Sequence, residues 1–281
     1  NQWGFVDFNR PMVAINQWEQ AADSMYTLCG KDRIHPSTDG HLVMAYLFLK
    51  AQGLAGKPVA DIRIDGAGKK VTRSDNCRVS DLSVSSDNLT FTYEAKSLPY
   101  PIDTSYYDNE KHTQADALSV IPFMDEMNYE GLSVSGLSDG YYGLTIGGEF
   151  IGRFTARELE RGINMALLQN TPQYKQAMKI RQMNEERWLK ERKMREFYWV
   201  EYNLMRKTGM LWACDEAAVD TLRKYRPHDI FLQWNGDLWL QYMHKGIRED
   251  CVNEQQNLVD RIYEQNKPIP LRIEIKKFTD L

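Results

Sequence analysis

Cysteine is sparse in this sequence, and no two cysteines are close enough to form a metal or redox motif. The 281 residues contain four cysteines, with no Cys-x-x-Cys spacing among them: Cys29, Cys77, Cys214 and Cys251. Such a set does not fix the cellular compartment, because isolated cysteines are often free and buried. The five histidines form no His-Glu-x-x-His pair. The sequence therefore indicates no metal site, and it carries no motif for another cofactor.

Long apolar runs and a strong net charge are also missing. The longest clean apolar run, Leu42–Leu49, is far shorter than the roughly 20 residues that a membrane span needs, so no span is expected. The formal net charge of -4 gives no indication of nucleic acid as a partner. Hydrophobic residues make up 42% of the chain, which is ordinary for a globular protein with a sizeable core.

Residues 1–56 have the pattern of the last elements of an α/β domain. A mostly apolar run from Trp3 to Phe8 predicts a strand buried on both faces, as in a parallel sheet. Apolar residues at helical spacing follow, from Met12 to Ala22. After a loop, a second helix is expected from about His41 to Gln52, ending at Gly53.

Residues 57–154 change to an alternating pattern and predict a small, mainly antiparallel β domain with an insertion. Tight turns are expected at Asp139-Gly140 and Gly147-Gly148. The expected strands are 59–64, 71–73, 78–84, 89–93, 132–135, 141–146 and 149–154, and a helix is expected over 115–127.

Residues 155–281 predict a helical region with a closing strand. Thr155 and Glu158 form a capping-box pattern before a helix that is expected to reach Leu168. A very long helix is then expected from Pro172 to about residue 207. Further helices are expected over 215–225 and 236–266, followed by a strand over 271–278.

The candidate catalytic residues of the sequence lie in one short loop, Asp32-Arg33-Ile34-His35-Pro36. The spacing lets the Asp32 carboxylate fold back on one ring nitrogen of His35, which fixes the tautomer and stabilises the imidazolium. His35 would then act as general base for a hydroxyl nucleophile and as general acid for the leaving alcohol. Pro36 restricts His35 to extended conformations. A plain ion pair in a loop before a helix is the structural alternative.

This block resembles the last conserved block of the SGNH/GDSL hydrolases, a family of serine esterases with a flavodoxin-like α/β/α fold. Asp32, His35 and Pro36 are followed by Gly40-His41 and the apolar helix Leu42–Leu49, and WGFVDFNRPM precedes the block. The stretch 140–168 is similar to a tail found on some bacterial members. The resemblance covers residues 3–53, and more loosely 130 to about 200.

The resemblance implies acyl-ester hydrolysis with His35 as base and Asp32 as its orienter. The Gly-Asp-Ser block, the oxyanion glycine and the Gly-x-Asn-Asp block of the family are not in this sequence, so no residue here inherits the nucleophile. The chain is therefore expected to be the C-terminal part of a hydrolase, with the serine supplied from upstream sequence or by an N-terminal chain. The implied substrate is a small acyl ester or an acylated carbohydrate, and the implied location is secreted or periplasmic.

Other interpretations stay open at this point. Ser138 lies in a literal Gly-x-Ser-x-Gly, but the expected strands on both sides indicate a hairpin turn rather than a nucleophile elbow. Ser37 is best explained as a cap.

The chain is alternatively a non-catalytic carbohydrate-binding or scaffold protein that keeps a relic of the hydrolase block. The aromatic residues at helical spacing near 197–202, and Trp234 with Trp239, suit either core packing or sugar binding. The tyrosine-rich loop 100–107 is a candidate border of a substrate cleft.

Overall fold

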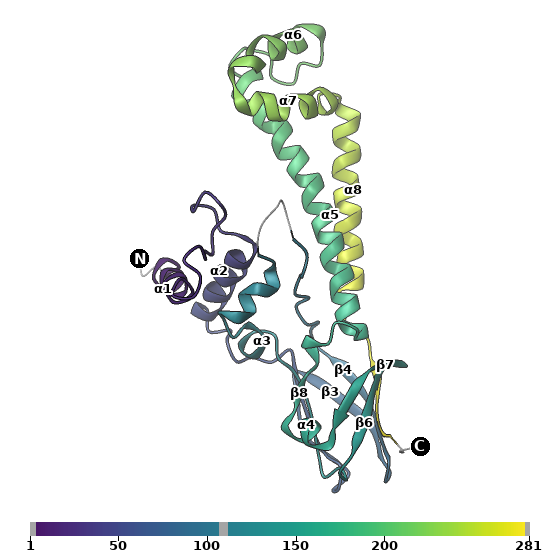
Figure 1. Cartoon of the computed structure of the whole chain (residues 1–281). Helices are drawn as coiled ribbons and strands as arrows, with labels where there is room; N and C mark the ends of the chain where they lie inside the picture. The colour runs from purple at the N-terminus through teal and green to yellow at the C-terminus, as the bar shows by residue number, and fades with distance from the viewer. Residues whose placement is uncertain (1–3, 107–111, 279–281) are drawn as a thin grey trace. The chain divides into compact units, whose positions relative to one another are not determined.

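The computed structural model describes residues 4–106 and 112–278. The chain divides into two compact units, which are described separately. Unit 1 comprises residues 1–177 together with 267–281, and unit 2 comprises residues 178–266. Figure 1 shows unit 1 as a helical part and a β part, and unit 2 as a set of helices.

The helical part of unit 1 is built around α1 and α2, with two short helices from later in the chain. These elements are α1 (Asn9–Glu19), α2 (Thr38–Ala51), the 3₁₀-helix η1 (Gln114–Ser119) and α3 (Phe123–Glu126). Their buried side chains form a common core that includes Leu28, Val43, Tyr46, Ala117 and Phe123. Pro122 lies between η1 and α3, and the helix expected over 115–127 is accordingly split in two.

The prediction of a flavodoxin-like α/β domain end in residues 1–56 is wrong. Trp3 lies outside the described residues, and residues 4–8 form no strand. Asp7 instead accepts a hydrogen bond from the Arg10 backbone N–H at 3.1 Å and so supports the start of α1, while Phe5 is 84% exposed. A short apolar run is a buried strand only where neighbouring strands pair with it, and no described strand does so here.

The β part of unit 1 contains two sheets. The first has the order β2-β1-β5-β8, with a parallel pairing between β1 and β5. The second has the order β3-β4-β9-β6-β7 and is antiparallel. The strands are β1 (Ala60–Asp65), β2 (Lys70–Asp75), β3 (Cys77–Val84), β4 (Asn88–Ala95), β5 (Glu130–Ser135), β6 (Tyr141–Ile146), β7 (Glu149–Thr155), β8 (Ile163–Asn164) and β9 (Leu271–Lys277). The seven strands expected over 59–154 therefore match β1 to β7 closely.

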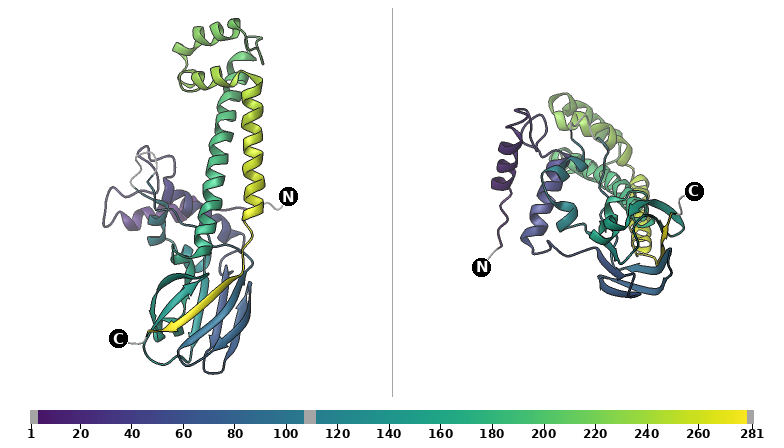
Figure 2. Two further views of the ribbon diagram at one scale, coloured as in Figure 1. Left: turned by 90° about the vertical axis from the view of Figure 1, so that its right-hand side faces the viewer. Right: turned by 60° about the horizontal axis from the view of Figure 1, so that its bottom comes forward.

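The strand β9 comes from the C-terminal end of the described chain and lies between β4 and β6 (Figure 2, left, in yellow). Its alternate residues Leu271, Ile273 and Ile275 are buried, so the strand contributes one row of side chains to the core. The strand expected over 271–278 is confirmed. The alternation of apolar residues in β9 does not show that the strand lies in the middle of a sheet whose other strands come much earlier in the chain.

The chain after β7 forms a shorter helix than the sequence predicts. Thr155 and Glu158 make the expected capping box, with the Glu158 N–H donating to Thr155 Oγ1 at 3.2 Å. The helix α4 (Ala156–Arg161) then stops because Gly162 adopts φ 94°, and the 3₁₀-helix η2 (Met165–Leu167) follows β8.

Unit 2 consists of two long helices side by side, with shorter helices joining them at one end (Figures 1 and 2). The elements are α5 (Pro172–Val200, in unit 2 from Met178), the π-helical turn η3 (Glu201–Met205), α6 (Glu216–Tyr225), the 3₁₀-helix η4 (Arg226–His228), α7 (Ile230–Tyr242) and α8 (Lys245–Gln265). The helix expected over 236–266 is two helices, and α7 begins earlier than expected because Asp229 accepts hydrogen bonds from two N–H groups of its first turn.

Candidate active site

The loop that carries Asp32 and His35 is a tight turn in the helical part of unit 1. The Gly30 N–H donates to the His35 carbonyl oxygen at 2.8 Å, and the Arg33 N–H donates to the Gly30 carbonyl oxygen at 3.0 Å. Arg33 adopts φ 58°, the left-handed conformation that reverses the chain at the tip. These two hydrogen bonds close the turn between Gly30 and His35.

Both carboxylate oxygens of Asp32 take part in hydrogen bonds within the loop. Oδ1 accepts hydrogen bonds from the backbone N–H groups of Ile34 at 2.9 Å and His35 at 3.1 Å. Oδ2 lies 2.5 Å from His35 Nδ1. The hydrogen bond to the His35 ring, followed by the two backbone N–H groups, lowers the pKa of Asp32 to about 2. Asp32 therefore stays ionised at any ordinary working pH and fixes the imidazole in one orientation.

The second ring nitrogen of His35 is open. The His35 side chain is 82% exposed and that of Asp32 is 47% exposed. With Nδ1–H donating to the carboxylate, the lone pair is on Nε2, the atom that a general base uses. No hydroxyl of the described residues hydrogen-bonds to this nitrogen. The structure thus brings the two residues of the predicted site together and, among the residues it describes, places no hydroxyl within hydrogen-bond distance of Nε2.

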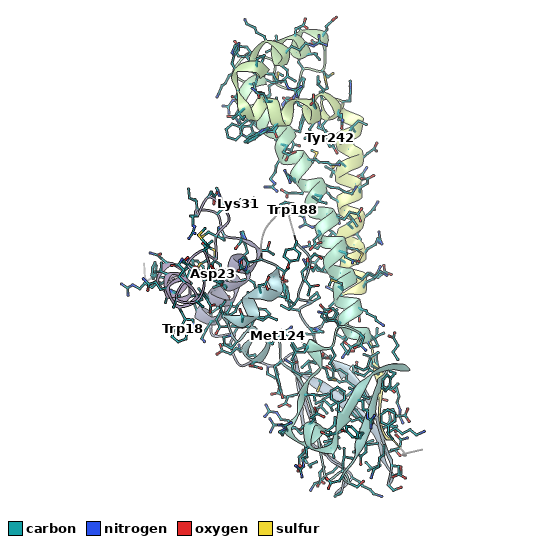
Figure 3. The ribbon with its side chains drawn as sticks, in the orientation of Figure 1. Trp18, Asp23, Lys31, Met124, Trp188 and Tyr242 are labelled. Atoms are coloured by element: carbon teal, nitrogen blue, oxygen red, sulfur yellow. The ribbon has the colours of Figure 1, made fainter. Side chains whose placement is uncertain are left out.

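Large apolar side chains are exposed in the same helical part. Helix α1 has no buried residue at all. The exposed fractions are Phe5 84%, Trp18 79%, Ile34 74%, Met25 63% and Val13 43%. Figure 3 labels Trp18, Asp23 and Lys31 in this region. A shallow hollow of about 320 Å³ lies here and is lined by Ala14, Ile15, Trp18, Glu19, Ser119 and Val120. Trp18 and its apolar neighbours in this hollow form a candidate interaction surface.

A second carboxylate–imidazole pair lies at the start of α2. Asp39 is fully buried, and its Oδ1 accepts hydrogen bonds from the Ser37 hydroxyl and from the Gly40 N–H, the latter at 2.8 Å. Its Oδ2 is 3.5 Å from His112 Nδ1. The Tyr26 ring meets the His112 ring edge-on, and burial followed by the charge of Asp39 raises the pKa of Tyr26 to about 12. Sequence reasoning missed this pair, because its members are 73 positions apart and no local motif links them.

The serines considered in the sequence have structural places. Ser37 is the N-cap residue of α2 and is buried. Ser138 lies in the connection between β5 and β6, where its hydroxyl accepts a hydrogen bond from Lys277 Nζ at 2.7 Å and lies 3.1 Å from the Tyr142 hydroxyl. A strand follows Ser138, so Ser138 does not lie in a nucleophile elbow. The expected hairpin turn is wrong, because β5 and β6 belong to different sheets and do not pair.

The aromatic residues of unit 2 divide into core and surface. Phe197 and Trp239 are fully buried, as the core-packing interpretation predicts. Tyr198 and Tyr202 are 39% and 48% exposed, and Trp234 is 67% exposed. The loop 100–107, the candidate border of a substrate cleft, includes Tyr107, which lies outside the described residues.

Two further classes of site have no support in residues 4–106 and 112–278. No group of three or more histidine, cysteine, aspartate or glutamate side chains in these ranges is placed to hold a metal ion. No helix within them combines the length and the apolar character that crossing a membrane requires.

Comparisons with known proteins find similarity to proteins that act on diltiazem. A family model described as the diltiazem deacetylase C-terminal helical domain matches residues 178–267, a range that includes the whole of unit 2. A solved structure of a gut microbial diltiazem-metabolizing enzyme is 43% identical, with a TM-score of 0.92 over 99% of this chain. The chain spans 63% of the length of that enzyme. No curated protein matches the chain.

These matches correct the assignment suggested by the Asp32–His35 block. The resemblance to SGNH/GDSL hydrolases is wrong as a family assignment, because the matching family model and the matching structure belong to diltiazem deacetylation and diltiazem metabolism. The matching fold has two mixed or antiparallel sheets and a C-terminal helical domain. A five-residue block in which only Asp, His and Pro are specified is short enough to recur in unrelated loops, so it does not identify a family by itself. By sequence and by structure, the chain is thus similar to a diltiazem-metabolizing enzyme.

Proposed function

We propose that this chain takes part in the hydrolysis of a carboxylic ester, the removal of an acetyl group, with His35 as general base. The observation that carries the proposal is the 2.5 Å contact between His35 Nδ1 and Asp32 Oδ2, which leaves Nε2 open. Similarity to a diltiazem-metabolizing enzyme over 99% of the chain supports the same chemistry. Diltiazem is therefore the first substrate to test, and an acetylated carbohydrate is the second.

In the proposed reaction, His35 Nε2 removes the proton from a serine hydroxyl as that oxygen attacks the ester carbonyl carbon. Nε2 then returns the proton to the leaving alcohol as the C–O bond breaks, and an acyl-enzyme forms. A water molecule repeats the sequence: it loses its proton to Nε2, the acid is released, and the serine oxygen recovers the proton. Asp32 stays ionised throughout and stabilises the imidazolium.

The proposal assigns the serine and the oxyanion-binding N–H groups to polypeptide outside this chain. Two apolar side chains at the loop support a covering polypeptide at this surface: Ile34 is 74% exposed, and Met25, whose carbonyl oxygen accepts from Arg33 at 3.5 Å, is 63% exposed. The similar enzyme is longer than this chain, which spans 63% of it. In the covered state, His35 would lose water contact and Nε2 would face the nucleophile.

The test is ester hydrolysis by the complete gene product, with diltiazem and p-nitrophenyl acetate as substrates. His35→Ala is expected to lower kcat/KM by about 10²- to 10⁴-fold, the usual contribution of a general base. The matched control is His41→Ala, since His41 is also exposed and uses its Nδ1 only to bind the Ser37 carbonyl oxygen at 3.0 Å. Wild-type kcat/KM in His35→Ala would show that His35 is not the base.

A second candidate function, a non-catalytic carbohydrate-binding or scaffold protein, is favoured by the 82% exposure of His35. A catalytic base normally lies in a site that limits its contact with water. The same assay separates the two functions. Absence of hydrolysis of both esters, and of acetylated xylan, by the complete gene product would favour the scaffold.

A further inference from the structure

Three aromatic side chains form an exposed group at one end of α5 in unit 2. We name Tyr198, Tyr202 and Trp212 the Trp212 platform. Their exposed fractions are 39%, 48% and 45%. Each tyrosine ring stands nearly perpendicular to the Trp212 ring, at 88°, with 6.0 Å between ring centroids. Trp212 is also stacked on the buried Phe197, at 30° and 6.4 Å, so one side of the indole is supported by the core.

The backbone that presents Trp212 is held in an unfavourable conformation. Trp212 adopts φ 66°, a region that bulky side chains rarely occupy. Its N–H donates at 2.9 Å to Oε2 of Glu201, and Oε1 of the same carboxylate accepts from Trp239 Nε1 at 2.8 Å. Glu201 is 1% exposed and begins the π-helical turn η3. A buried carboxylate, a π-turn and a strained backbone thus combine to keep one indole at the surface.

Such an arrangement is hard to explain by packing alone. An indole needed only for the core would be buried, and a relaxed backbone would serve that purpose without strain. π-turns and strained residues occur preferentially at functional sites, where they hold a group in the geometry that a ligand requires. A rigid aromatic group also binds with little loss of side-chain freedom.

The polar atoms of the platform indicate what it binds. In the part of the chain that the structure describes, neither tyrosine hydroxyl nor the Trp212 indole N–H is hydrogen-bonded to another residue. The platform therefore offers apolar ring faces with free hydrogen-bonding groups at their edges. Ring faces alone can hold a cation, but a cation would leave the free hydroxyl and indole N–H groups without a partner, and Glu201 is committed to two N–H groups in the interior. A sugar ring matches this pattern, because it has an apolar C–H face and hydroxyl groups around its rim.

We propose that the Trp212 platform is a carbohydrate-binding site that takes a sugar ring of a neutral oligosaccharide or polysaccharide. One ring face of the sugar stacks on Trp212, and the hydroxyl groups of Tyr198 and Tyr202 bind the sugar hydroxyls. The site is independent of His35, so its existence does not depend on ester hydrolysis.

The experiment is isothermal titration of the full chain with neutral hexasaccharides of glucose, xylose and N-acetylglucosamine. At least one is expected to bind with a Kd of roughly 10⁻⁴ to 10⁻³ M, a range suited to a single exposed site. Trp212→Gly is the decisive variant, because glycine accepts φ 66° and the substitution removes ring and strain together. It is expected to keep the fold by circular dichroism and to weaken binding at least about tenfold.

The matched control is Trp188→Ala. Trp188 is 46% exposed and lies on α5 ten residues before Tyr198, about 15 Å along the helix axis (Figure 3). Its substitution is expected to leave binding unchanged, whereas Tyr202→Phe, which removes one free hydroxyl, is expected to weaken binding a few-fold. The proposal is overturned if no hexasaccharide binds, if Trp212→Gly binds as tightly as wild type, if Trp188→Ala loses binding equally, or if choline binds in place of the sugars.

Discussion

Asp32 and Glu130 are both carboxylates of unit 1, but their surroundings shift their pKa values in opposite directions. Asp32 lies in an exposed loop, and three hydrogen bonds to its charged form lower its pKa to about 2. Glu130 starts β5 and is fully buried, and burial raises its pKa to about 7. Its Oε1 accepts from the Tyr93 hydroxyl at 2.8 Å and from Gln173 Nε2 at 3.2 Å, while Oε2 has no partner among the described residues.

The difference shows that burial alone does not identify a catalytic carboxylate. Glu130 has the kind of raised pKa often found in active sites, yet its neighbours belong to two sheets and to the first turn of α5, and no open surface adjoins it. Asp32 has an ordinary exposed position, but it holds an imidazole whose other nitrogen is free. The two residues should therefore respond to substitution in different ways, Asp32 through activity and Glu130 through stability.

The largest expected effect is on activity, from Asp32→Asn in the complete gene product. The amide would no longer stabilise the imidazolium of His35 and would favour the wrong tautomer, so kcat for ester hydrolysis should fall by about 10²- to 10⁴-fold. The thermal unfolding midpoint should stay close to that of wild type, because the Asp32 side chain is half exposed. A midpoint that falls while kcat is kept would assign Asp32 a structural role.

The next effect is a pH dependence of stability that Glu130 should produce. Because its pKa is higher in the folded state than the ordinary value of 4.5, the folded protein binds the proton more tightly than the unfolded chain. Its stabilising contribution is complete below pH 4.5 and is lost as the pH rises through about 7. Glu130→Gln stays neutral, so its stability relative to wild type should increase by on the order of 2–3 kcal/mol between pH 4.5 and 8.

Urea denaturation at several pH values would measure the Glu130 effect, with the exposed Glu160→Gln as the matched control. The control should show no such change with pH. If Glu130→Gln and wild type lose stability in parallel as the pH rises, the buried carboxyl is not the group that titrates.

The local features of unit 1 were predictable from the sequence, and the long-range ones were not. Alternation identified β1 to β7, and Gly147-Gly148 marked the turn between β6 and β7, because these signals lie within a few residues. The insertion of β9 between β4 and β6 depends on a pairing of residues almost 190 positions apart, and alternation does not specify a partner. The supposed strand at residues 3–8 failed for the same reason, since its composition could not show that no strand would pair with it.

In the candidate site, too, the local contact could be predicted from the sequence and the long-range contact could not. Asp32 and His35 are three residues apart, so their contact follows from local chain geometry and could be proposed from spacing alone. Asp39 and His112 meet only after the chain folds, and His112 looked like an isolated histidine in the sequence. The exposure of Trp212 was equally hidden, because it depends on a carboxylate eleven residues earlier that is buried by tertiary packing.

The smallest expected effects come from two glycines that test how firmly the Asp32–His35 loop is tied to α2. A Cβ at Gly40 would overlap the carbonyl oxygen of Leu28, the acceptor of the Ser37 N–H at 3.0 Å at the base of the loop. Gly40→Ala should therefore displace the loop, destabilise the protein by about 1–3 kcal/mol and lower kcat as well.

Gly246 in α8 provides the opposite case, because a Cβ there would meet no atom within 4 Å. Gly246→Ala should raise the free energy of unfolding by about 0.5–1 kcal/mol, since alanine loses less backbone freedom on folding than glycine does, and it should leave kcat unchanged. Urea denaturation measures the free energy of unfolding of both variants, and the ester assay measures their kcat. If Gly40→Ala lowered stability without changing kcat, the position of His35 would not depend on the start of α2, and the loop would be held by its own hydrogen bonds alone.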